Sequence, residues 1–137
     1  LSRRGDSIKP GSDYLTRFMQ DVQKLPEEVV KMKGDFYALF HRELFQLAGD
    51  ERKTADWAAK QTYLPMANMM TTAALLGIDS CPIEGFKQQE VENFLAQEIE
   101  LDLTTFGVAH ITAFGYRKAE PARAKTRRAA VDVVQWY

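Results

Sequence analysis

The stretch that decides the fold is TADWAAKQTYLPMANMMTTAALL, which runs from Thr54 to Leu76 and is followed by Gly77. Thr54 suits a helix N-cap and Gly77 suits a C-terminal stop, so we predict one long helix over 54–76 that Pro65 kinks or locally loosens. Apolar residues occur on nearly every side of this helix, a pattern typical of a helix surrounded by protein or lipid. We expect a partner subunit to share it, since one chain of this size would struggle to cover it all round.

A membrane span is the alternative for this stretch, because its length approaches that of a transmembrane helix. Polar residues and a proline interrupt the apolar run, so no 18 consecutive strongly apolar residues occur. These interruptions are Lys60, Gln61, Pro65, Asn68, Thr71 and Thr72. We therefore expect a core helix and no membrane association.

The segments around this helix predict an α+β protein in which helices outnumber strands. Residues 26–47 carry apolar side chains every three or four positions after Pro26, which predicts an amphipathic helix of about six turns. Residues 78–86 suggest a short extended stretch, 88–98 a helix, and 106–114 one mostly buried strand. We expect 1–25 to be a loop followed by a short helical piece, 115–124 a loop, and 129–137 a short helix or extended tail.

Length and composition fit one globular domain. The 137 residues are 45% hydrophobic and 27% charged, with a formal net charge of −1. This balance argues against a surface devoted to nucleic acid or to an acidic membrane. The single cysteine, Cys81, excludes an internal disulfide framework and fits a reducing compartment such as the cytoplasm. The first residues show no sign of a signal peptide, and we expect a chain entered partway through.

Side chains for metal or nucleophilic chemistry are few. His41 and His110 lie far apart in sequence and outside any metal-binding spacing, so we expect a surface residue and a strand residue, and no metal site. Cys81 precedes a proline in the extended stretch, and we expect a buried, inert thiol. No glycine-rich phosphate-binding motif is present, and no catalytic acid, base or nucleophile stands out.

Two segments could carry a binding function. In Cys81–Phe86, a proline stiffens the chain and Gly85 lets the backbone come within hydrogen-bonding distance of a flat ligand. The segment from Arg117 to Arg128 contains six basic residues and one acidic residue, Glu120. Lys125 and Arg127 could supply two cations to one phosphate. The alternative is a solvated basic loop. Nucleic-acid binding is disfavoured because no aromatic residues alternate with these charges.

These segments together resemble the C-terminal part of the nitroreductase family, the FMN-dependent NAD(P)H oxidoreductases. The resemblance runs from about Asp56 to Trp136. It includes the motifs Lys60-Gln61-Thr62-Tyr63, Gly77-Ile78-Asp79-Ser80-Cys81-Pro82-Ile83-Glu84-Gly85-Phe86, Phe114-Gly115-Tyr116-Arg117 and Lys125-Thr126-Arg127.

The resemblance implies a nitroreductase-like fold with a small central sheet, and a homodimer that holds FMN between its subunits, with the long helix at the interface. It places the segment Pro82, Ile83, Glu84 and Gly85 along the flavin, with the Glu84 and Gly85 backbone near N5 and O4. It assigns Lys125, Thr126 and Arg127 to the FMN phosphate. The implied reaction is ping-pong: NAD(P)H reduces the flavin and leaves, and a nitroaromatic, quinone or free flavin is then reduced.

One departure from the family concerns the N-terminus. The pair Arg3-Arg4 looks like the basic motif with which family members begin, but it lies only about eighty residues before Pro82, so its role is not carried over. We expect Leu1 to mark the end of a central strand and residues 1–137 to form a single, incomplete domain. A dimerisation module without cofactor is the alternative function.

Overall fold

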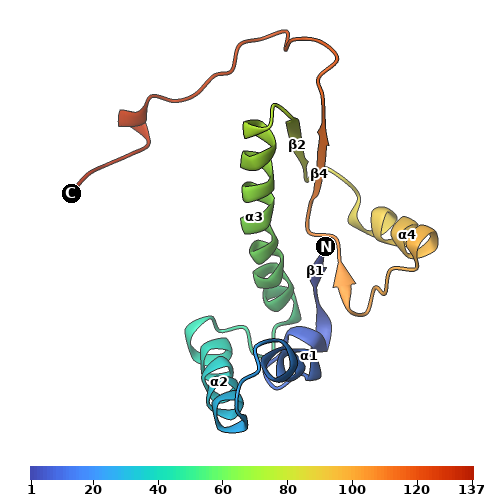
Figure 1. Ribbon diagram of the computed structural model, residues 1–137, viewed down its shortest axis with the longest axis vertical. Coiled ribbons are helices and arrows are strands. Elements are labelled where there is room, and N and C mark those ends of the chain that lie inside the picture. The colour runs from blue at the N-terminus through green and yellow to red at the C-terminus, as the bar shows by residue number, and fades with distance from the viewer.

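Helix α3 (Glu51–Leu75) is the axis of the molecule in this computed structural model, which describes residues 1–137 (Figure 1). The helix begins three residues before the predicted start because the Asp50 carboxylate accepts the Lys53 N–H at 2.9 Å. It continues through Pro65 and ends as predicted at Gly77, where a φ of 73° reverses the chain. The backbone N–H of Ile78 then donates to the Ala73 carbonyl at 2.8 Å.

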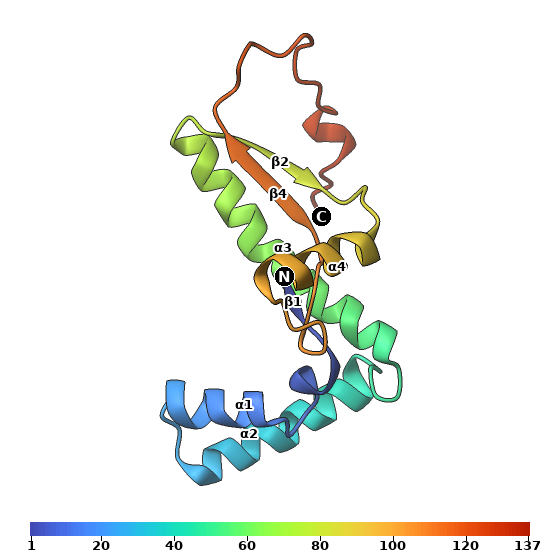
Figure 2. The same cartoon turned by 90° about the vertical axis from the view of Figure 1, so that its right-hand side faces the viewer.

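A two-stranded antiparallel sheet lies along the C-terminal half of α3. It consists of β2 (Asp79–Ile83) and β4 (Ile111–Gly115), whose register pairs Asp79 with Gly115 and Ile83 with Ile111. Figures 1 and 2 both place this sheet beside α3. The extended stretch predicted after Gly77 is thus confirmed as the strand that returns along the helix.

The single strand predicted over 106–114 is wrong, because this segment forms two strands in different sheets. Its first part, β3 (Phe106–Gly107), pairs with β1 (Ser2–Arg3), and its second part is β4. The break occurs where the backbone N–H of Val108 donates to a side chain, the Glu92 carboxylate, at 3.0 Å. The expected small central sheet is therefore two separate two-stranded sheets.

Helix α4 (Gln88–Ile99), predicted over 88–98, is held against β1 and β3 by one buried carboxylate. Glu92 is 3% exposed and accepts from the Val108 N–H, the Gln88 amide and the Arg4 guanidinium. Burial alone would raise the pKa of Glu92, but these three donors together hold it below its usual value. Arg4 thus has a structural role within this chain.

A helical hairpin at the N-terminal end of α3 contains two helices that each widen into a π-helical turn. Helix α1 (Asp13–Arg17), which follows a 3₁₀ turn at Gly5–Ile8, continues into Phe18–Val22, and α2 (Glu27–Leu39) continues into Phe40–Leu44. The predicted helix over 26–47 is thus shorter and changes its winding after Leu39. Within the π turn, His41 is 6% exposed, so the predicted surface position is wrong. The side chain turns inward beside Tyr37.

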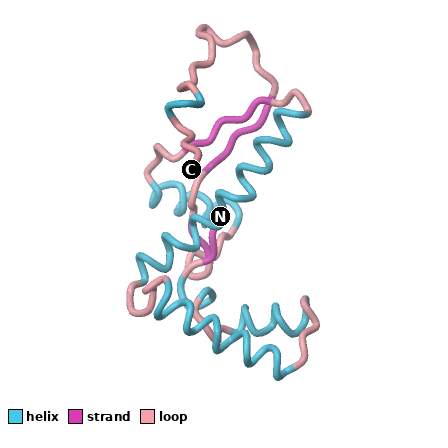
Figure 3. The backbone as a smooth tube through the Cα atoms, turned by 90° about the vertical axis from the view of Figure 1, so that its left-hand side faces the viewer, coloured by secondary structure: helices cyan, strands magenta, loops and turns pink.

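The last residues form an arm that leaves the body of the molecule after β4. Figure 3 shows this arm, residues 116–137, as loop apart from the short 3₁₀ turn Ala130–Asp132, which matches the predicted extended tail. Figure 1 shows the C-terminus well away from the other elements. Trp136, near its end, is 91% exposed.

The hydrophobic core is small for a chain of this length. Its buried apolar residues are Ile8, Val30, Leu47, Ala58, Ala73 and Val108. Large apolar side chains of α3 remain exposed, among them Leu64, Met69 and Leu75, the last at 84%. Within one chain α3 is covered by β1, the 3₁₀ turn Gly5–Ile8 and β2, and the apolar side chains named above remain uncovered. None of the helices has the combination of length and apolar character that crossing a bilayer requires.

Candidate functional site

The segment Pro82–Gly85 lies at the exposed end of β2, where the ladder with β4 stops. The backbone N–H groups of Glu84 and Gly85 donate to no other group of the protein, whereas the Glu84 carbonyl accepts from Phe86 at 2.9 Å. Two adjacent unsatisfied donors therefore point to a ligand or to water.

Gly85 itself leaves open space beside this backbone. Its φ is not positive, and a Cβ placed on it would meet nothing within 4 Å. Neither backbone strain nor packing inside this chain therefore requires a glycine here. The open face leaves room for a flat group to approach the two free N–H donors, so these residues fit the edge of a flavin.

The Glu84 side chain turns toward α3, where its carboxylate accepts a hydrogen bond from the Tyr63 hydroxyl. This contact with Glu84, then burial and the charge of the carboxylate, raise the pKa of Tyr63. His110 lies against Tyr63, with ring centroids 5.0 Å apart. The predicted strand position of His110 is wrong, because this residue lies in the break between β3 and β4. The sequence prediction missed this cluster, because Glu84 and His110 lie 21 and 47 positions from Tyr63 and meet it only in the folded chain.

The basic residues Lys125, Thr126 and Arg127 lie on the arm and are exposed. Neither Lys125 nor Arg127 has a carboxylate within 4.0 Å, and the Arg127 guanidinium donates to the Thr126 carbonyl at 2.7 Å. Both cations are thus available to an anion, which fits the charge of a phosphate.

Arg117 fixes the point at which the arm leaves the sheet. Its Nε and Nη2 donate to the two carboxylate oxygens of Asp79, each at 2.7 Å, and its Nη1 donates to Glu120 at 2.9 Å. The hydrogen bond from Arg117, assisted by the charges of Arg117 and Lys125, lowers the pKa of Asp79 against a smaller effect of burial. Arg117 is therefore occupied within the protein, unlike Lys125 and Arg127.

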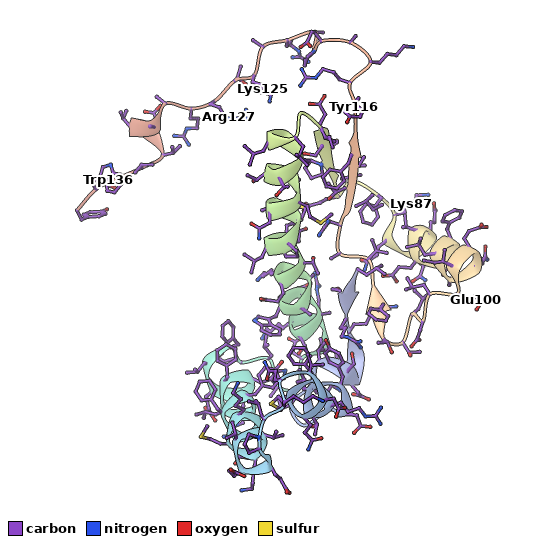
Figure 4. The ribbon with its side chains drawn as sticks, viewed as in Figure 1. Lys87, Glu100, Tyr116, Lys125, Arg127 and Trp136 are labelled. Carbon is purple, nitrogen blue, oxygen red and sulfur yellow. The ribbon has the colours of Figure 1, made fainter.

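The structure does not bring the two predicted segments together. Figure 4 shows Lys87, which follows Gly85 closely in sequence, well separated from Lys125 and Arg127. The two segments are linked through β2, since Asp79 at its start anchors the arm and Gly85 lies just beyond its end.

The structure shows neither a metal-binding group nor a buried thiol. No three His, Cys, Asp or Glu side chains gather as a metal-binding group. Cys81 is exposed, so the predicted buried thiol is wrong. The reason is that the face of β2 opposite α3 is left uncovered.

Comparison with known proteins identifies the family. The nitroreductase family model matches residues 15–116. A Staphylococcus epidermidis protein provisionally named an NAD(P)H nitroreductase is 43% identical over 130 residues, which are 95% of this chain and 59% of that protein. YfkO of Bacillus subtilis, with the same provisional name, is 40% identical over 136 residues, or 99% of this chain and 61% of YfkO. The chain thus spans about three fifths of the length of these relatives.

Solved structures show the same fold. The provisionally named nitroreductase ydfN of Bacillus subtilis superposes with a TM-score of 0.64 at 19% identity, covering 89% of this chain and 58% of ydfN. A Staphylococcus epidermidis protein provisionally named an NAD(P)H:FMN oxidoreductase gives a TM-score of 0.61 at 21% identity, covering 90% and 53%. At these identities the likeness concerns the fold, which confirms the α+β, nitroreductase-like prediction. Together with the family-model match and the identity of about 40% to the curated relatives, it places this chain in the nitroreductase family.

Proposed function

We propose that this chain is the FMN-holding part of an NAD(P)H-dependent oxidoreductase. The observation that carries the proposal is the pair of free backbone N–H groups at Glu84 and Gly85, with open space beside them. When bound, FMN would accept hydride from NAD(P)H and pass it to a nitroaromatic, a quinone or free flavin in alternating half-reactions.

The chain's own contribution is to bind and orient the cofactor. Pro82 and Ile83 would stiffen the backbone beside the ring, and the N–H donors of Glu84 and Gly85 would stabilise the negative charge that reduction adds to it. Lys125, Thr126 and Arg127 would hold the phosphate by charge-assisted hydrogen bonds. No acid, base or nucleophile of the protein is needed for this chemistry, because the cofactor carries it.

The proposal includes a homodimer and a reducing, cytoplasmic location. The exposed apolar side chains of α3, such as Leu64 and Leu75, support an interface along this helix. The exposed free thiol of Cys81 suits a compartment that keeps thiols reduced.

FMN titration tests the proposal. The wild-type chain should bind FMN with quenching of flavin fluorescence, and the double variant Lys125→Ala/Arg127→Ala should bind at least tenfold more weakly, since each charge-assisted bond contributes about 1.5–3 kcal/mol. Arg123→Ala/Arg128→Ala removes two charges from the same arm and is the matched control. Equal losses in the two double variants would show that these residues form no specific phosphate site.

A dimerisation module without cofactor is the second candidate, and the same apolar face of α3 favours it. Sedimentation of the chain with and without FMN separates the two candidates. A dimer that takes up no FMN and gains no thermal stability from it would select the second.

A further inference from the structure

Tyr63 joins the long helix to the candidate flavin-binding backbone, and this inference rests on the function proposed above. Its ring projects from the middle of α3, and its hydroxyl donates to the carboxylate of Glu84, just beyond the end of β2. The contact links two residues that are 21 positions apart. It is the direct side-chain bond between α3 and the segment Pro82–Gly85.

His110 fixes the position of the Tyr63 ring. Its Nε2 lies 3.3 Å from the Thr62 carbonyl oxygen, within hydrogen-bonding distance. Its Nδ1 lies 3.5 Å from the Thr112 hydroxyl. The imidazole is thus tied to α3 on one side and to β4 on the other. Its contact with the Tyr63 ring restricts the direction in which the phenol points.

The strand register determines what this arrangement does to Glu84. The ladder ends with the pair Ile83 and Ile111, and the residue just beyond each of them, Glu84 and His110, contacts Tyr63 on the face turned to α3. Holding the carboxylate on this face fixes the orientation of the Glu84 peptide. Its N–H and that of Gly85 remain free of protein partners.

We propose that Tyr63 is a positioning residue: it holds the Glu84 side chain on α3 and thereby presents the Glu84 and Gly85 N–H groups to the flavin edge. The phenol acts through Glu84 and does not touch the cofactor itself. Its effect should be larger on reduced than on oxidised FMN, because the N–H donors stabilise the charge that reduction adds.

The Tyr63–Glu84 contact is tested first without flavin. In an ultraviolet titration of the phenols, Tyr63→Phe should remove a group that ionises above the usual tyrosine range, in agreement with the raised pKa of Tyr63. The matched control is Tyr116→Phe, at an exposed residue whose hydroxyl makes no hydrogen bond within the protein. If the two difference curves coincide, the hydrogen bond to Glu84 does not form and the proposal fails.

The second experiment measures FMN affinity. Tyr63→Phe should weaken the binding of reduced FMN on the order of tenfold and of oxidised FMN less, so that the potential of bound flavin becomes more negative. The matched control is Tyr37→Phe, which removes a phenol that donates to the Ile8 carbonyl at 3.1 Å in the helical hairpin. It should lower thermal stability and leave both affinities unchanged.

The outcomes separate the two proposals. If the wild-type chain binds no FMN, the proposed function fails and the role of Tyr63 fails with it. If the wild type binds FMN and Tyr63→Phe behaves like Tyr37→Phe, or weakens both redox forms equally, the role of Tyr63 alone is refuted.

Discussion

Replacing Glu92 by leucine should destabilise the chain, because Glu92 is the buried residue of α4. The carboxylate is the acceptor for three donors from three different segments: the Val108 N–H at 3.0 Å, the Gln88 amide at 3.1 Å and the Arg4 guanidinium at 3.2 Å. Leucine has about the same size and accepts no hydrogen bond. The Val108 N–H and the Arg4 Nη1 would therefore lose this acceptor, whereas the Gln88 amide keeps the Val108 carbonyl at 3.3 Å.

The magnitude follows from how far water can reach each donor. Val108 is 6% exposed, so its N–H would stay buried without an acceptor, at a cost of about 1–3 kcal/mol. The Arg4 side chain is 30% exposed and regains water, so that its lost bond costs about 1 kcal/mol. Burial of the leucine side chain offsets part of this loss. A net decrease of roughly 2–3 kcal/mol is expected, out of about 5–15 kcal/mol for a typical domain.

Urea unfolding followed by circular dichroism measures this loss. The matched control is Glu90→Leu on the same helix, where the carboxylate pairs with Lys87 at 2.7 Å but is 69% exposed, so the change should stay within about 0.5 kcal/mol. Glu92→Gln keeps an oxygen for Val108 and should lose about half as much as leucine, which preserves the test if the leucine variant does not fold. Equal unfolding midpoints for the two leucine variants would refute this account.

Three further changes test separate parts of the molecule. Burial holds the pKa of His41 below its usual value of 6.5, so the unfolded chain takes up the proton at a higher pH than the folded chain. The free energy of unfolding should therefore decrease as the pH drops below about 6.5. Thermal unfolding at several pH values should show that His41→Phe removes this decrease, and an unchanged pH profile would contradict it. Asp79→Asn should cost at most about 1 kcal/mol in thermal unfolding, because its pair with Arg117 is about 40% exposed; a larger loss would mean that the pair is buried in solution. Gly85→Val should leave the unfolding midpoint unchanged and weaken FMN binding, because the added side chain meets only open space; unchanged FMN affinity would remove Gly85 from the site.

The long helix and its return strand could be predicted from the sequence because their signals are local. The apolar pattern over 54–76 and the stop at Gly77 depend on neighbouring residues, and the structure ends α3 as predicted. Helix α3 begins three residues before the predicted position because Asp50, and not Thr54, is its N-cap. The extended stretch that ends at Gly85 also follows from local sequence, and the structure leaves Gly85 exposed with open space beside it.

Long-range contacts explain what the sequence could not show. The strand predicted over 106–114 is interrupted because Val108 bonds to Glu92, a residue 16 positions away that the helical pattern presents as an ordinary polar site. His41 is buried because it lies on the same helical face as Val30 and Tyr37, and this face turns inward while the predicted apolar positions Met32 and Phe36 stay exposed. Tyr63 and Glu84 belong to two separate sequence motifs, and nothing in either motif shows that the two side chains meet in the folded chain.

Strand β2 sets the separation of the two candidate segments. Asp79 at its start binds Arg117, where the arm with Lys125 begins, and Gly85 follows its other end. Six residue steps of extended chain place Asp79 and Gly85 roughly 20 Å apart. Lys125 lies eight residues further along the arm from Arg117, and Figure 4 shows it well separated from Lys87 beside Gly85. One FMN molecule would therefore contact both segments only after the arm had moved toward Gly85, with Arg117 and Asp79 as the fixed point of that movement.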